Sequence, residues 1–248
     1  MAGSDDSVRI DIDLGEAERE AERIRTWLAA LRRRHDLAPF EYTRHVRIVP
    51  AGATYSHPIL TLGTRFTETE DLLLSTYLHE QMHWYLWLLG GPDHDPVAPF
   101  FDELVRRYPQ APVWLPEGAR SYEQTYVHLV VCWLEIEATS QLIGRTRANR
   151  MADTTWGYRW IYRTVVADRD PLCDLFTEHG LYPKRARTPL AQVGEELLEH
   201  RARLALAEAW IDLRRVVAGR VAEHARAVLD ATALGVRRAV VQTAQARE

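Results

Sequence analysis

The chain has 248 residues, of which 46% are hydrophobic, so it can bury a core and is not an intrinsically disordered protein. Its formal net charge of -4 gives no general attraction to nucleic acid or to an anionic membrane, and no apolar run is long enough to span a bilayer. Two cysteines, Cys132 and Cys173, are too few for a disulfide framework. The polar start lacks the basic and apolar regions of a secretion signal, so we expect a cytoplasmic protein.

The first third of the chain predicts one helix and two short strands. Residues 14–34 read as an amphipathic helix, whose apolar stripe consists of Ala17, Ala21, Ile24, Leu28 and Leu31. Residues 45–49 alternate between polar and apolar side chains, and residues 59–62 follow a turn rich in Gly, Ser and Pro. Both segments therefore predict strands, and the second leads directly into the next helix.

That next helix carries the most informative motif. Thr67 and Glu70 fit a capping box, which predicts a helix over residues 67–89 that ends at Gly90-Gly91-Pro92. It contains His79-Glu80-Gln81-Met82-His83, an H-E-x-x-H pattern. Because residues four apart stack on one helix face, His79 and His83 can present two imidazoles to one metal ion. Glu80 lies one step round the helix, where it can take a proton from water held by the ion.

A structural alternative is a helix with two core histidines and one hydrogen-bonded glutamate. The flanking positions are apolar, however, and a charged group is rarely buried unless it is paired or bound to metal. We therefore favour a metal site. A strand directly before such a helix is also what a metallopeptidase uses to pair with an extended substrate, although it equally fits an ordinary strand of a small sheet.

The rest of the chain reads as further helices. Asp93-His94-Asp95-Pro96 predicts a surface turn, and residues 100–108 a short helix. A long helix is expected to open at Trp114 and run to Ile143, with an apolar middle that includes His128 and Glu135. Residues 156–166 form another helix, which carries Tyr158 and Tyr162 on one face. From residue 188 the composition predicts helices that either pack on the core or mediate self-association.

A catalytic zinc usually needs a third protein ligand. The H-E-x-x-H helix followed by Trp114-Leu115-Pro116-Glu117-Gly118 resembles the gluzincin branch of zinc metallopeptidases, in which a glutamate on a later segment binds zinc. The resemblance implies a Zn2+ site formed by His79, His83 and Glu117. It departs from the aminopeptidase pattern, in which Asn stands at the position of Pro116. His128 and Glu135 are alternative third ligands, but not together, because two helical turns separate them by about 10 Å.

We expect a mainly α, α+β fold. The resemblance implies a zincin-like domain with a small sheet, which we assign to residues 1–187, and the change in composition predicts a helical C-terminal extension over residues 188–248. The favoured function is a zinc-dependent hydrolase, a metallopeptidase in which Glu80 is the general base and Tyr162, His128 or Tyr158 stabilises the oxyanion. The expected partner is a peptide or small amide substrate, with no nucleic-acid or membrane partner and self-association through the C-terminal helices.

Two other functions fit the same residues. The first is a zincin-fold enzyme that acts on a non-peptide amide or a biosynthetic intermediate. The second is a non-catalytic metal-binding helical protein that mediates interactions.

Overall fold

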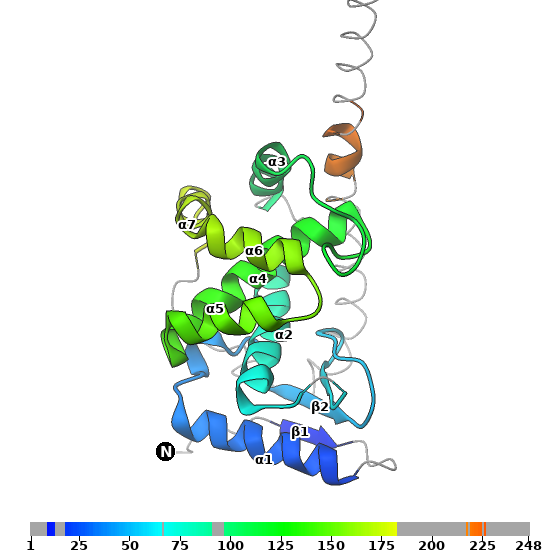
Figure 1. The fold of residues 1–248 in the computed structure, drawn as a ribbon, viewed down its shortest axis with the longest axis vertical. Helices are drawn as coiled ribbons and strands as arrows, with labels where there is room; N and C mark the ends of the chain where they lie inside the picture. The colour runs from blue at the N-terminus through cyan, green and yellow to red at the C-terminus, as the bar shows by residue number, and fades with distance from the viewer. Residues whose placement is uncertain are drawn as a thin grey trace, which may run out of the picture.

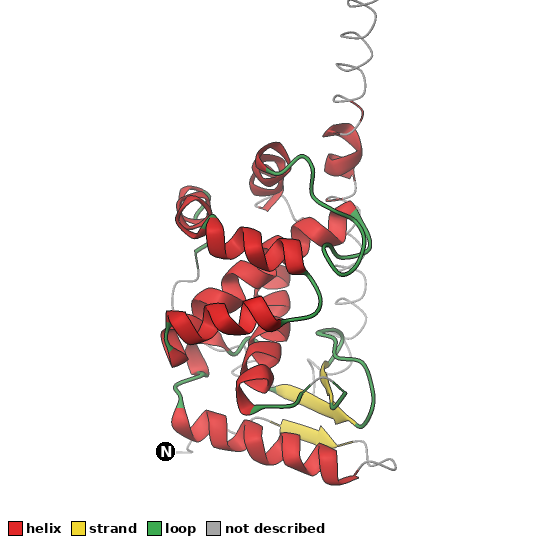
Figure 2. Cartoon of the chain, viewed as in Figure 1, coloured by secondary structure: helices red, strands yellow, loops and turns green. Residues whose placement is uncertain are grey.

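The computed structural model describes residues 9–12, 18–65, 67–90, 97–182, 217, 219–224 and 226. Helices dominate these residues, and the strands form one small sheet (Figure 2), which confirms the predicted mainly α, α+β class. None of the helices in these ranges combines the length and apolar character needed to cross a membrane.

Three parallel strands form the sheet. They are β1 (Arg9–Ile12), β2 (His45–Val49) and β3 (Leu60–Gly63), in the order β1-β2-β3. In the register, Arg9 lies beside His45 and Val46 beside Leu60. The two predicted strands are confirmed. The sequence analysis missed β1, although residues 8–14 alternate strictly between apolar and polar side chains.

Helix α1 (Glu18–Arg34) connects β1 to β2 and lies next to them (Figure 1). Most of the predicted apolar stripe is confirmed, because four of its members are buried; Ala17 lies outside the described residues. The buried members are Ala21, Ile24, Leu28 and Leu31.

The outer edge of β3 is paired with the chain itself. The Thr61 N–H donates to the Tyr55 carbonyl at 2.8 Å, and the Tyr55 N–H donates back to the Thr61 carbonyl at 3.0 Å. The Gly63 N–H donates to Thr54 Oγ1 at 2.9 Å. A Cβ on Gly63 would lie 2.0 Å from the Gly52 carbonyl oxygen, so only glycine allows this loop to approach so closely. The backbone donors on this edge are therefore already used.

The motif helix α2 (Glu70–Gly90) starts with a different cap from the predicted one. The Leu72 N–H donates to Thr69 Oγ1 at 3.2 Å, so Thr69 caps the helix. The predicted capping box at Thr67 is wrong, because the Thr67 hydroxyl donates to the Gly63 carbonyl instead, at 3.1 Å. Thr67 thus ties the end of β3 to the start of α2.

Helix α4 (Tyr122–Ile143) packs against α2 along the centre of the molecule (Figure 1). Ser121 caps it by accepting a hydrogen bond from the Gln124 N–H at 3.1 Å. The predicted start at Trp114 is wrong, because residues 114–118 form a turn that the Gly118 N–H closes onto the Trp114 carbonyl at 2.7 Å. The long central helix is otherwise confirmed.

Four shorter helices surround this pair. The sequence predicted α3 and α6 but not α5 or α7, which bury only three residues each. Gly144, with φ of 85°, provides the turn between α4 and α5. The four are α3 (Ala98–Arg107), α5 (Arg145–Thr154), α6 (Arg159–Ala167) and α7 (Arg169–Glu178).

Only a short helical part of the C-terminal extension is described. Val217 is buried in the core, and Arg220 lies 3.7 Å from Asp102 of α3. This part therefore packs on the core. The boundary at residue 188, the rest of the extension with its predicted self-association, and the turn at residues 93–96 lie outside the described residues.

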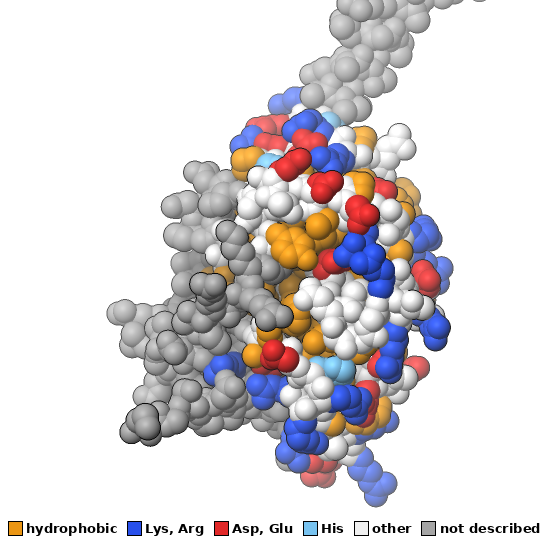
Figure 3. All heavy atoms as spheres, turned by 90° about the vertical axis from the view of Figure 1, so that its left-hand side faces the viewer, with side chains coloured by type: hydrophobic (Ala, Val, Ile, Leu, Met, Phe, Trp, Pro, Cys, Tyr) orange, Lys and Arg blue, Asp and Glu red, His pale blue; other side chains and the backbone are white. Residues whose placement is uncertain are grey.

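Arg and acidic side chains occur together on the face shown in Figure 3, around a central apolar area. Such mixing agrees with the nearly balanced charge of the sequence.

Candidate metal centre

Three buried histidines meet between α2 and α4. His79 and His83 come from the H-E-x-x-H motif of α2, and His128 comes from the second turn of α4. The ring centres of His79 and His83 are 5.0 Å apart, and that of His128 lies 5.5 and 5.0 Å from them. One potential ligand atom from each histidine lies within 4.8 Å of the others. We call these three residues the His cluster.

Hydrogen bonds fix the tautomers of two of these histidines. His128 Nδ1 lies 2.7 Å from the Gln124 carbonyl, which only accepts, so Nδ1 carries the proton and Nε2 has the lone pair. His79 Nδ1 lies 2.9 Å from Glu135 Oε2, and its Nε2 is the remaining nitrogen for a metal. A metal-binding histidine typically donates its other N–H to a carbonyl or carboxylate in this way.

The electrostatic surroundings of the His cluster differ between its members. Burial, followed by the neighbouring His128, His79 and His57, lowers the pKa of His83 well below its ordinary value of 6.5. Burial also opposes protonation of His79, but Cys132 and Glu135 raise its pKa well above 6.5. Burial thus favours the neutral form of His83, which is the form that binds a metal, whereas Cys132 and Glu135 favour the protonated form of His79.

Glu80 is a buried carboxylate beside the His cluster, with 7% of the residue exposed. Burial raises its pKa to about 7; His79 lowers and Glu135 raises it by smaller amounts. Within the described ranges, no group donates a hydrogen bond to its side chain. Burial thus disfavours the ionised form, and a carboxyl group with a pKa near neutral is suited to accept and release a proton.

The raised pKa of Glu80 leads to a pH-dependent prediction for the metal-free protein. The unfolded chain ionises Glu80 from about pH 4.5 and the folded chain only near 7, so stability decreases as pH rises between these values and then levels off. Moving a pKa from 4.5 to about 7 corresponds to about 3 kcal/mol. In the presence of a chelator, Glu80→Gln is expected to stabilise the protein by up to about this amount at pH 8 and much less at pH 5. Urea denaturation at both pH values tests this, and equal effects at both would contradict it.

Tyr158 forms one wall of the centre. It precedes α6 with φ of 58°, a left-handed conformation that is unusual for a residue with a side chain. Its ring centre lies 4.4 Å from that of His128 and 6.2 Å from that of His79. The next residue, Arg159, donates its N–H to the Pro116 carbonyl at 2.8 Å, which holds this segment in place.

The structure does not bring Glu117 into the His cluster. Its carboxylate pairs with Arg163 of α6 at 2.5 Å, and it belongs to neither group of ligand atoms that could share an ion. Among the described residues, His128 rather than Glu117 lies with His79 and His83, while the role of Glu117 as third ligand stays a prediction. Glu117 lies apart because residues 114–118 form a turn against α6 instead of the first turn of α4.

Glu135 and Tyr162 lie on the Nδ1 side of His79. The Tyr162 hydroxyl donates to Glu135 Oε2 at 2.8 Å, and the Ser75 hydroxyl donates to Glu135 Oε1. The Tyr162 hydroxyl thus donates to the carboxylate that also bonds His79, and its predicted catalytic role stays a prediction. Of the two tyrosines that were predicted as possible oxyanion stabilisers, Tyr158 has its ring next to that of His128.

Two neighbours of His79 were not foreseen as part of the centre. Ser75 stands four residues before His79 on α2, so helical spacing alone could have placed both on one face. Cys132 is a free, buried cysteine, and its Sγ lies 4.0 Å from His79 Nδ1. His79, Cys132 and Glu135 thus form a second group of atoms that could share an ion.

The site is a candidate metal centre with three imidazoles and one adjacent carboxylate. This set of donors suits a divalent ion such as zinc. Comparison with known protein families, curated proteins and solved structures finds no match to this chain.

Proposed function

We propose that the protein is a metal-dependent hydrolase that cleaves an amide bond, with His79, His83 and His128 as the residues that hold the ion and Zn2+ as that ion. The strongest support is the burial of Glu80 beside the His cluster without a hydrogen-bond donor among the described residues. A carboxylate in this position can accept a proton from a water or substrate that occupies the site.

The roles of the surrounding residues follow from their chemistry. A bound divalent ion would supply Lewis acidity, which polarises a carbonyl and lowers the pKa of a coordinated water. Glu80 accepts the proton of the attacking water and passes it to the leaving amine. Tyr158, whose pKa burial raises above 10.0, keeps its proton at neutral pH and can donate it to a developing oxyanion.

The relation to zincins remains part of this proposal. It rests on the strand that leads into a helix with H-E-x-x-H, which β3 and α2 provide. His128 as the third ligand differs from the glutamate of the gluzincin pattern. Three histidines with an open fourth position are also a known arrangement of catalytic zinc.

The covered edge of β3 favours a small amide over an extended peptide. Strand addition needs unpaired backbone groups, but the Thr61 and Gly63 N–H groups already donate to residues 54 and 55. A peptide therefore cannot pair with β3 at these positions unless the loop moves.

Of the large hydrophobic side chains that the described residues expose, three lie on loops and one, Tyr122, begins α4. Tyr55 precedes Ser56 and His57, and the His57 ring stacks on Trp84, the residue after His83, at 4.6 Å. Trp156 lies two residues before Tyr158, in the loop between α5 and α6. This loop and the loop between β2 and β3 are on the right-hand side of Figure 1. Trp114 and Tyr122 complete this exposed set. An amide with an apolar or aromatic group fits such surroundings.

Metal analysis combined with a substrate screen tests the proposed function. We expect about one zinc ion per chain, hydrolysis of small aryl and acyl amides, loss of activity with a chelator and recovery with Zn2+. Hydroxamates should inhibit, since they occupy an open metal position. No bound metal after zinc is supplied would overturn the proposal, and metal without hydrolysis of any amide or peptide would indicate a non-catalytic site.

A further inference from the structure

The carboxylate of Glu135 is buried and fixed in position by hydrogen bonds. It is 1% exposed and lies on α4, where both of its oxygens accept hydrogen bonds. Ser75 donates to Oε1, and Tyr162 donates to Oε2 at 2.8 Å. Oε2 also lies 2.9 Å from His79 Nδ1. Three donors from α2 and α6 thus fix one carboxylate in position.

The geometry separates Glu135 from the ion that the His cluster would hold. Glu135 contacts His79 at Nδ1, whereas the tautomer with a proton on Nδ1 presents Nε2 to a metal. His128 stands two helical turns before Glu135, about 10 Å along the axis, so the two cannot bind one ion together. The group formed by His79, His83 and His128 accordingly does not include Glu135.

We propose that Glu135 is a positioning residue for His79. It accepts the Nδ1–H, fixes the ring and the tautomer that directs Nε2 to the ion, and is itself held by Ser75 and Tyr162. This assignment rests on the proposed function, because it presupposes an ion at the His cluster. A carboxylate in this position also makes the imidazole a more basic ligand, and loss of such a partner typically lowers metal affinity by about 10- to 100-fold.

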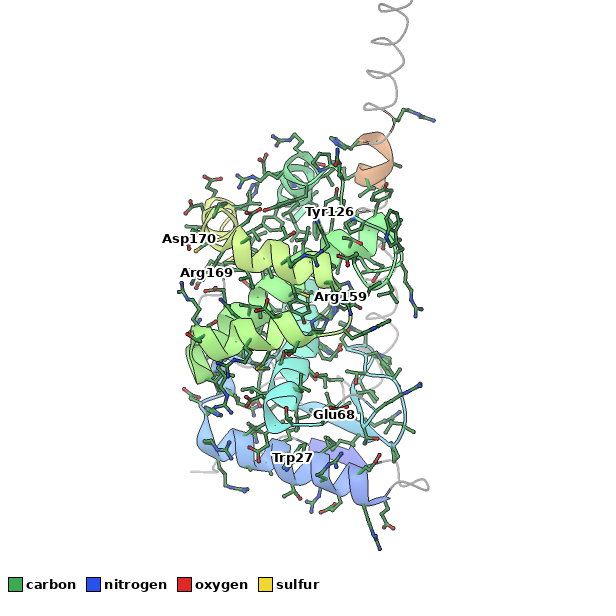
Figure 4. The ribbon with its side chains drawn as sticks, viewed as in Figure 1. Trp27, Glu68, Tyr126, Arg159, Arg169 and Asp170 are labelled. Atoms are coloured by element: carbon green, nitrogen blue, oxygen red, sulfur yellow. The ribbon has the colours of Figure 1, made fainter. Side chains whose placement is uncertain are left out.

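The chain offers a matched control on the same helix. Glu137 is also a buried carboxylate, and Arg169 holds it through Nε and Nη2, both at 2.6 Å. Figure 4 shows Arg169 at the opposite end of α6 from Arg159, which neighbours Tyr158. Glu137, at 7% exposed against 1% for Glu135, is also buried, so Glu137→Gln removes a buried charge from the same helix without touching His79.

Competitive zinc titration of metal-free protein tests the assignment. Glu135→Gln is expected to weaken Zn2+ binding by about 10- to 100-fold while one ion per chain is still bound at saturation. Tyr162→Phe removes only one hydroxyl and should cause a smaller loss, so it serves if the first variant folds poorly. Glu137→Gln should bind zinc as the wild type does.

Nitrogen-15 NMR of the His79 ring supplies a readout that a purely structural role would not change. In the zinc-loaded wild type we expect a proton on Nδ1 and zinc on Nε2. Wild-type zinc affinity in Glu135→Gln would overturn the assignment. Loss of zinc in Glu135→Gln or Cys132→Ala, with retention in His128→Gln, would also overturn it, because the ion would then lie among His79, Cys132 and Glu135. A wild type that binds no zinc would instead overturn the proposed function.

Discussion

Glu80→Gln is expected to lower amide hydrolysis by about 10²- to 10⁴-fold, the usual contribution of a general base, while zinc stays bound. The amide of Gln has nearly the shape of the carboxylate but cannot accept the proton of the attacking water. Because Glu80 is adjacent to the His cluster but is not one of its three members, the ligand set is unchanged. Steady-state rates and zinc content of the same preparation measure both effects.

Glu70→Gln is the matched control for this variant. Glu70 lies at the start of the same helix, where it pairs with Arg34 at 2.7 Å, so its loss should leave hydrolysis unchanged. A Glu80→Gln variant with nearly full activity would exclude the proposed mechanism. A variant that loses zinc together with activity would indicate that Glu80 is itself a ligand.

His128→Ala is expected to reduce bound zinc from about one ion per chain to almost none, whereas Glu117→Ala should keep it. The physical reason is that two imidazoles alone hold zinc weakly, and His128 supplies the third buried nitrogen, while Glu117 pairs with Arg163. Elemental analysis of both purified variants, with circular dichroism to confirm folding, provides the comparison.

His128→Gln repeats the test with a side chain of similar size if the alanine variant unfolds. Loss of zinc in Glu117→Ala would return the third-ligand position to the gluzincin-like glutamate, whereas retention in both His128 variants would exclude His128 as a ligand. The comparison thus decides between the residue that the sequence pattern favoured and the residue that the fold brings to the motif.

Local patterns predicted the elements that carry the motif. The positions of His79, Glu80 and His83 relative to each other depend only on helical spacing, so the sequence is sufficient to place them on one helix. The strands β2 and β3 were likewise visible in their alternation and flanking turns.

The third ligand could not be predicted in the same way because it depends on how two helices cross. The apolar surface of α4 is continuous, so its sequence does not show whether His128 or Glu135 lies level with His79. In the structure both residues lie close to His79. His128 belongs to the His cluster, and Glu135 contacts His79 at Nδ1. The helix start was predicted too early, at Trp114, because Pro116 and Glu117 are typical of a helix start, whereas Ser121 provides the actual cap.

The loop over β3 also has a consequence for the protein in a crowded solution. An uncovered edge strand is a template onto which another polypeptide can add, and such addition is a common route to aggregation. Thr54 and Tyr55 occupy this template from within the chain, and Gly63 allows them to come close enough to do so. These contacts within the chain therefore protect this side of the sheet from intermolecular β-pairing.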